Sequence, residues 1–302
     1  MLLGFGLPVS GAWATPENIA GFAERAETLG YHGVWSFSRL LVATDQDLDP
    51  VYKSVLDPLL PLAFAAAGTT RIRLGVAVVN APFVSPAYLA KQAATLDVLS
   101  AGRLDLGLGV GWSPAEFAAT GASPDRRGAQ LEEYLRVLRT LWTDEVSAFN
   151  GEFYTVPASR MAPKPVQSAG PPVLLGGSAP AALRRAGRLA DGWVSRSATD
   201  LSQIGEQIAV VRRAAQRAGR DPDAIRVVTR GVVRVGADHG RRLAGGYSKI
   251  RADTAWLAEQ GVTELFYDLN WDPLVGSPSV TAAAATARAS EILEELAPAR
   301  HS

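Results

Sequence analysis

The chain has 302 residues, of which 47% are hydrophobic and 20% charged, the composition of a folded globular protein with a large core. Thirty basic side chains balance 30 acidic ones, so no excess charge directs the chain to nucleic acid or to a membrane surface. The absence of cysteine excludes disulfides, thiolate zinc sites and cysteine nucleophiles. No run approaches about 18 uninterrupted apolar residues, and we expect a cytoplasmic protein without a membrane span.

The first half of the chain alternates between short apolar strands and helices. Thr15 and Pro16 are a typical helix start, and Gly30 is a typical end. The segment 72–80 is apolar on both faces, as in the buried strand of a parallel sheet. We expect strands at 2–8, 33–38, 72–80 and 103–111, followed by helices at 16–29, 57–67, 86–100 and 124–142.

The second half continues this alternation after an interruption at 144–170, where the sequence predicts a small hairpin and a proline-rich return. We expect four more strands at 172–176, 192–195, 225–235 and 264–269, and helices at 180–189, 201–218, 248–260 and 280–296, with Ser248 capping the third of these. Eight strands that are each followed by a helix predict one α/β domain over 1–302, a (β/α)8 barrel with an insertion after its fourth strand.

Active sites of such barrels lie at the carboxyl ends of the strands. The expected strand ends are rich in glycine, aromatic residues and arginine and poor in general acids and bases. They comprise Leu7–Pro8, Phe37–Arg39, Val79–Asn80, Gly111–Trp112, Gly176–Ser178, Ser195–Arg196, Arg230 and Asp268–Trp271. No dinucleotide fingerprint, P-loop or metal-binding cluster is expected, because the remaining candidates are isolated histidines and helix-face acids, namely His32, His239, His301, Glu132–Glu133 and Glu294–Glu295.

The sharpest local signal is the turn at 174–180, where a strand runs into Gly176, Gly177 and Ser178 before a helix. Glycines let the backbone approach a ligand closely, and the free N–H groups at a helix start attract phosphate. The same pattern also fits an ordinary turn in which Ser178 caps the helix. Pattern alone leaves both interpretations open.

Three segments resemble the luciferase-like monooxygenase superfamily of flavin- and deazaflavin-dependent oxidoreductases, and the similarity extends from the first strand to LFYDLNWDP near the eighth. These segments are GYHGVWSFSRLL, the stretch from Arg71 to Trp112, and PPVLLGGSAPAALRRAGRLADGWV. The resemblance implies the (β/α)8 barrel with its insertion at 144–170. It also implies a cofactor phosphate on Gly176, Gly177 and Ser178.

The resemblance further implies a bulge in the strand at 72–80 with a non-prolyl cis peptide against the cofactor ring, for which Ala77–Val78 is the best match. Asn80 and Trp112 are expected beside the ring, although Trp112 could instead be a core lid. Many deazaflavin-dependent relatives carry an acid–histidine pair where this chain has Phe37–Ser38–Arg39. The catalytic candidates are therefore Arg39 and Arg196 as polar contacts, with a rim salt bridge as the alternative for Arg39.

The resulting hypothesis is an oxidoreductase that uses the deazaflavin F420 for hydride transfer to or from a small organic substrate. One alternative is an FMN-dependent monooxygenase fed by a partner flavin reductase, and another is a flavin-binding barrel without turnover. The acidic tail of F420 could pass along Arg184 and Arg188, which share a helix face with Arg185 nearby, unless these arginines only solvate that helix. The resemblance also implies a homodimer.

Overall fold

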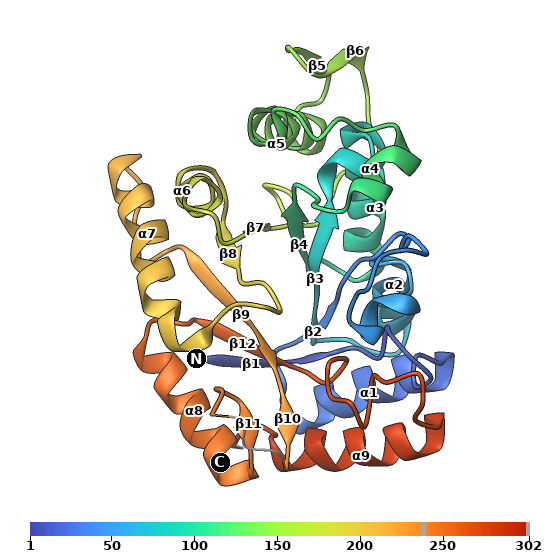
Figure 1. Ribbon diagram of the computed structural model, residues 1–302. Coiled ribbons are helices and arrows are strands. Elements are labelled where there is room, and N and C mark those ends of the chain that lie inside the picture. The colour runs from blue at the N-terminus through green and yellow to red at the C-terminus, as the bar shows by residue number, and fades with distance from the viewer. Residues whose placement is uncertain (237–239, 300–302) are drawn as a thin grey trace.

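The computed structural model describes residues 1–236 and 240–299, and within them eight parallel strands close into a barrel (Figure 1). The strand order around the barrel is β1-β12-β9-β8-β7-β4-β3-β2. The predicted (β/α)8 fold is confirmed. The barrel strands are β1 (Leu2–Gly6), β2 (Gly33–Ser36), β3 (Arg73–Asn80), β4 (Leu104–Gly109), β7 (Val173–Gly176), β8 (Gly192–Val194), β9 (Arg226–Val232) and β12 (Glu264–Asp268).

Helices surround the barrel on its outside (Figure 1). The Thr15 hydroxyl accepts a hydrogen bond from the Asn18 N–H, and Gly30 takes a left-handed φ of 87° at the end of the first helix, as the sequence predicted. The helices are α1 (Pro16–Leu29), α2 (Leu60–Ala67), α3 (Pro86–Leu99), α4 (Pro114–Thr120), α5 (Arg127–Thr143), α6 (Pro180–Leu189), α7 (Ile204–Arg217), α8 (Tyr247–Glu259) and α9 (Ala282–Glu295). Short 3-10 turns η1, η2 and η3 occupy Pro50–Lys53, Ala81–Phe83 and Leu201–Gln203.

Three predicted helix boundaries were wrong. The helix expected at 124–142 is preceded by the separate helix α4, which starts at Pro114 and stops at Gly121 with a φ of 68°. The cap of α8 is Gly246 in extended backbone rather than Ser248, which lies inside the helix. The helix expected from 201 begins with the turn η3, because the Asp200 carboxylate accepts the Ser202 N–H and tightens that first turn.

The insertion at 144–170 contains an antiparallel hairpin of β5 (Ser147–Asn150) and β6 (Thr155–Ser159), which stands outside the ring of helices beside α5 (Figure 1). The carboxylate of Glu133 on α5 accepts backbone N–H groups of Glu152, Phe153 and Tyr154 at 2.9, 2.8 and 2.6 Å. Glu133 is buried, so the expectation that Glu132–Glu133 is a solvated face was wrong for this residue. The partners of Glu133 lie about 20 residues further along the chain, so the pattern of residues along the helix could not indicate that this side chain is buried.

The barrel interior is filled in layers. At mid-height, Trp35 and Phe266 stack with ring centroids 5.1 Å apart, packed with Leu174, Val194 and Val228. A second, larger apolar core fills the space between the strands and the helices. No helix in the described ranges is long and apolar enough to cross a membrane. The filled interior leaves ligand sites to the loops at the barrel ends.

Candidate functional site

The first part of the candidate site is the end of β3. Its pairing with β4 shifts register at a bulge, and the Ala77–Val78 peptide is cis, as predicted. The carbonyl oxygen of Val78 accepts a hydrogen bond from the Ser38 hydroxyl at 2.6 Å, and that of Ala77 accepts one from Arg230 Nη1 at 3.3 Å. Side chains from the ends of two other strands therefore fix the backbone at which we expected the cofactor ring.

The second part is the turn between β7 and α6. Gly177 has a φ of 126°, and a β-carbon there would lie 2.9 Å from the Cβ of Ala182, so only glycine fits. Arg196 Nη1 donates to the Ser178 hydroxyl oxygen at 3.2 Å, which brings two predicted site residues together. The helix cap is Ala179, without a side-chain hydrogen bond, so Ser178 is not the helix cap that the alternative interpretation required.

These two parts adjoin one another. A β-carbon built on Gly176 would lie 3.1 Å from Cγ1 of Val78, and one built on Gly109 would lie 2.7 Å from Cγ2 of Val78 and 3.1 Å from Oδ1 of Asn80. Glycines at the ends of β7 and β4 thus leave the room that Val78 and Asn80 occupy. No hydrogen bond joins the Asn80 side chain to another described residue, and its amide is therefore open to a ligand.

Arg39 is held by an ion pair whose partner the sequence did not identify. Its Nη1 lies 2.9 Å from Oε2 of the buried Glu116, whose Oε1 accepts the Leu40 N–H at 2.8 Å. The guanidinium is 4.7 Å from the ring centroid of Tyr52 and 4.4 Å from that of Trp112. The rim salt bridge is therefore present, while Trp112 is 48% exposed and is not a core lid.

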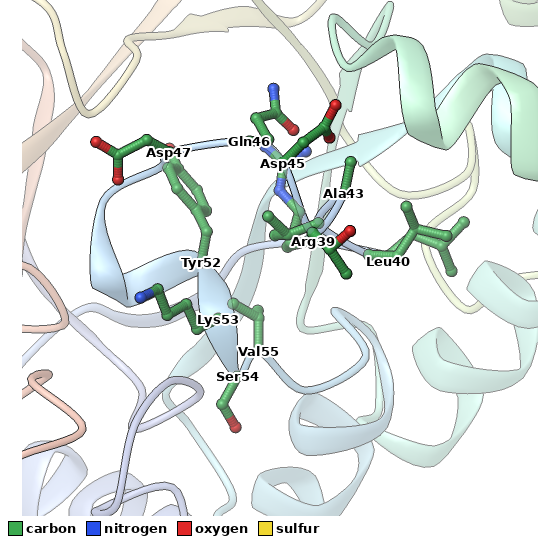
Figure 2. Close-up of a pocket in the computed structure, with 13 residues that line it drawn as sticks. Arg39, Leu40, Ala43, Asp45, Gln46, Asp47, Tyr52, Lys53, Ser54 and Val55 are labelled. Atoms are coloured by element: carbon green, nitrogen blue, oxygen red, sulfur yellow. The ribbon is translucent and has the colours of Figure 1, made fainter.

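A cavity of about 640 Å³ opens beside this ion pair, under the loop that follows β2 (Figure 2). Residues 39–47 and 52–55 line it. In Figure 2 the polar side chains of Asp45, Gln46 and Asp47 lie along the turn of the loop, with Tyr52 and Lys53 on the returning segment. The cavity has the size of a small-molecule site.

Arg230 is the most constrained cation at this end of the barrel. Its Nε lies 2.7 Å from Oδ2 of Asp268, and its guanidinium stacks 4.1 Å from the ring centroid of Trp271 and 4.5 Å from that of Phe37. The side chain is buried, yet Nη2 has no hydrogen-bond partner among the described residues. Its place at the end of a strand was noted in the sequence, but its contact with the β3 backbone was not.

The arginines of α6 differ from the expectation of a cofactor-tail path. Arg185 and Arg188 both lie against Glu132 on α5, at 3.2 and 2.7 Å. Arg188 thus joins two outer helices instead of standing free beside Arg184. Arg184 is exposed and is the only arginine of this trio without an ion pair to a described carboxylate.

The mouth of the barrel offers fixed cations, open backbone and few free acids. Glu116 and Asp268, the carboxylates that reach these residues, are each paired with an arginine. Such a site can bind and orient an anionic ring-bearing ligand, whereas general acid–base chemistry would have to come from the ligand or from water.

The architecture places the molecule among (β/α)8 barrel proteins. The family model described as luciferase-like monooxygenase matches residues 4–244, and the chain belongs to this family of oxidoreductases. The membership inferred from the three resembling segments is confirmed.

Relatives in the family differ in cofactor. An uncharacterised protein of Mycobacterium tuberculosis is 39% identical over 173 residues, 57% of this chain and 61% of the relative. The FMNH(2)-dependent dimethylsulfone monooxygenase of Pseudomonas putida is 33% identical over 156 residues, 51% of this chain and 42% of that protein. The F420-dependent glucose-6-phosphate dehydrogenase of Kineococcus radiotolerans is 29% identical over 222 residues, 72% of this chain and 64% of that protein. The matched region thus spans between 42% and 64% of the length of these relatives.

Solved structures agree on the fold. Monooxygenase RslO1 from Streptomyces bottropensis superposes with a TM-score of 0.79 at 23% identity over 98% of both chains. The coenzyme F420 dependent tetrahydromethanopterin reductase from Methanopyrus kandleri gives 0.77 at 18% identity, over 98% of this chain and 97% of that one. At such identities the likeness concerns the fold.

Proposed function

We propose that this protein is an oxidoreductase that uses F420 for hydride transfer to or from a small organic substrate. The observation that carries the proposal is the closeness of the Val78 side chain to Gly176, where a β-carbon would lie only 3.1 Å from Val78 Cγ1, so that the bulged end of β3 adjoins the Gly177–Ser178 turn. A cofactor with a flat ring at one end and a phosphate at the other needs two such adjoining surfaces. The F420-dependent relative aligned over 72% of this chain supports the choice of cofactor.

The residues present fit such a cofactor. Gly177 and Ser178, with Arg196 beside the Ser178 hydroxyl, would hold the phosphate, because exposed backbone N–H groups and a guanidinium both favour an anion. Ala77, Val78, Asn80 and Trp112 would border the ring. The bound deazaflavin would supply the hydride chemistry, while the protein orients the rings and excludes water.

The direct test is a side-by-side titration of the purified protein with F420 and FMN, followed by fluorescence quenching or calorimetry. We expect tighter binding of F420 than of FMN. We also expect either an alcohol to reduce oxidised F420 or an enone to oxidise reduced F420 when the substrate is added. Tighter binding of FMN would reject the F420 assignment.

A second candidate is the FMN-dependent monooxygenase supplied by a partner reductase, which the 33% identity to the dimethylsulfone monooxygenase favours. It predicts that an organic substrate gains one oxygen atom from O2 when reduced FMN is supplied, with the other atom released as water, and that no such product forms with F420. A barrel that binds flavin without turnover is the third candidate, because Glu116 and Asp268, the buried carboxylates beside the candidate site, are both ion-paired. Binding without consumption of reduced cofactor under either condition would select it.

We also propose that the protein forms a homodimer through the exposed apolar side chains of the neighbouring helices α2 and α3. Leu60, Phe64, Tyr88 and Leu99 are 68%, 51%, 64% and 65% exposed. Exposed apolar patches of this kind are typical of protein contacts. Sedimentation of the wild type and of Phe64→Glu tests the proposal, which predicts a dimer and a monomer respectively.

A further inference from the structure

A second cavity, of about 650 Å³, lies beside β9 and is separate from the cavity in Figure 2. It is bounded by the loop 197–202, by the short ladder of β10 (Arg234–Val235) and β11 (Ala244–Gly245), and by α8. Among its described lining residues, five cationic side chains face two acidic ones, namely Arg230, Arg234, Arg241, Arg242 and Lys249 against Asp200 and Asp253. Positive charge among the lining residues is therefore in excess by three, or by two once Asp268, the partner of Arg230, is counted, in a protein whose net charge is zero.

The two acids do not neutralise this excess. Asp253 accepts from Arg242 Nη1 at 2.7 Å, from Lys249 Nζ at 2.9 Å and from the Leu243 N–H at 2.9 Å. Asp200 uses Oδ1 to accept from the N–H and the hydroxyl of Ser202. Arg241 acts on Asp200 through its charge without a close ion pair, and Arg234 forms no ion pair with a carboxylate of the described residues.

Two donors that belong to lining residues are buried without a partner among the described residues. One is Nη2 of Arg230, whose side chain is 8% exposed, and the other is Nε of Arg234. Buried polar groups in native proteins are nearly always hydrogen-bonded, so these two guanidinium groups keep donor capacity that the described residues do not use. An oxyanion supplies both the acceptor atoms and the missing negative charge.

We propose that this cavity is an anion site that takes a carboxylate or phosphate group, separate from the Gly177–Ser178 turn. Its position links it to the candidate cofactor site: Arg230 also donates to the Ala77 carbonyl, and Thr199 on its rim accepts the N–H of Arg196. Two sources of the anion are compatible with this position, an acidic substrate and the acidic tail of F420. The assignment of a source rests on the proposed function, whereas anion binding does not.

The first experiment titrates the protein with inorganic phosphate, followed by calorimetry and by tryptophan fluorescence, because Trp271 stacks on Arg230 at 4.1 Å. The test variant is the double change Arg234→Gln and Arg241→Gln, which leaves the ion pairs of Arg230 and Arg242 in place. Arg196→Gln serves to identify phosphate bound at the Gly177–Ser178 turn. Arg213→Gln, an exposed arginine on α7, is the matched control.

We expect the double variant to bind phosphate at least 10-fold more weakly at one of two sites, with unchanged thermal melting. Arg196→Gln should weaken the other site, and Arg213→Gln neither. A double variant within two-fold of the wild type at both sites, or a wild type with a single site that only Arg196→Gln removes, would overturn the proposal.

The second experiment identifies the source by measuring F420 and FMN affinity in the same variants. A fall of at least five-fold for F420 in the double variant, with FMN unchanged, assigns the cavity to the cofactor tail. Unchanged F420 affinity, with phosphate still binding to the F420-saturated protein, assigns it to an acidic substrate. If the wild type binds neither cofactor, the proposed function fails, and the phosphate titration still decides the anion site.

Discussion

The ion pairs between arginine and carboxylate side chains differ between the two ends of the barrel. At the amino-terminal end, the buried Asp105 accepts from Nε and Nη2 of Arg73 at 2.7 and 2.8 Å and from Nη1 and Nη2 of Arg226 at 2.6 and 3.1 Å. Arg226 also reaches Glu264, which accepts the indole N–H of Trp35. Each of these four charged side chains therefore has an oppositely charged partner inside the protein.

At the carboxyl-terminal end the pairing is incomplete. Arg230 is tied to Asp268, and Arg39 to Glu116, but Nη2 of Arg230 and Nε of Arg39 have no hydrogen-bond partner among the described residues. A closed network contributes rigidity and stability, whereas an incomplete one keeps donors available to a ligand. The comparison predicts that substitutions at the first end change folding and that those at the second change binding.

The largest effect is expected for Asp105→Asn. The change leaves two arginines, each about a quarter exposed, without their shared charge partner, and removing one partner of a buried pair costs about 3 kcal/mol at the lower end of the usual range. Urea unfolding should show this loss, while the affinity for F420 or FMN of the folded fraction stays unchanged. The exposed Glu206→Gln on α7 is the control, with a change within about 0.5 kcal/mol. A folded variant of full stability would break the comparison.

For Gly177→Asp we expect a smaller free-energy change, which affects cofactor binding more than folding. The carboxylate would oppose the cofactor phosphate in a turn whose φ of 126° only glycine adopts readily. We expect cofactor affinity to fall by about 100-fold, which corresponds to about 2.7 kcal/mol, and stability to fall by less. Gly177→Ala separates backbone strain from charge, and equal loss of affinity in both variants would mean that charge plays no part.

The pH dependence of stability should sharpen the contrast. Burial alone would raise the pKa of Asp105, but the hydrogen bonds and charges of Arg73 and Arg226 lower it below its usual value. The stabilisation is therefore complete above the unfolded pKa of about 3.9 and disappears as pH falls through the lower folded pKa. The stability difference between wild type and Asp105→Asn should stay constant from about pH 7 to 5 and shrink below about pH 4, by at most about 1.4 kcal/mol per unit. If Arg73 and Arg226 did not stabilise the ionised form of Asp105, urea titrations would show the same stability difference between the two proteins at every pH.

The smallest effect is expected for Arg184→Glu, on the exposed face of α6. An exposed charge contributes about 0.2–1 kcal/mol, so F420 affinity should fall by roughly three-fold at low salt, and less at 1 M salt where screening acts over about 3 Å. FMN, which lacks the acidic tail, should bind unchanged. Arg213→Glu is the control, and identical affinities in all three proteins would remove α6 from the tail path.

The order of helices and strands could be predicted because each element is marked by residues within or next to it in the sequence. Proline and glycine mark the helix ends, as at Pro180 for α6, and buried parallel strands are apolar on both faces. The Gly177 turn was likewise found in one continuous segment, whereas the bulge in β3 was expected from the family resemblance. The missed helix α4 is only seven residues long and lies in a loop, where the strand–helix rhythm gives no guidance.

The pairings of the site could not be predicted, because they join distant segments. Glu116 contacts the backbone of Leu40 across 76 residues, and Arg230 contacts Ala77 across 153. Both contacts exist only once the barrel has closed. A sequence can show that an arginine stands at a strand end, but it cannot show which carboxylate or carbonyl the neighbouring strand ends bring to it.

The hairpin β5–β6 has a consequence for how this protein can be changed. Glu133 fixes it through three backbone N–H groups, which any residue other than proline supplies. Side chains of the turn add to this attachment, because the Tyr154 ring packs edge-on against Tyr134 with ring centroids 5.6 Å apart and Glu152 pairs with Arg126. The hairpin at 147–159 could therefore be exchanged for one of different sequence if a carboxylate remains at 133 and residue 154 stays aromatic. The return at 160–170 could not, because the Gln167 amide donates to Asp97 Oδ1 at 2.7 Å and to the Leu104 carbonyl at 2.9 Å.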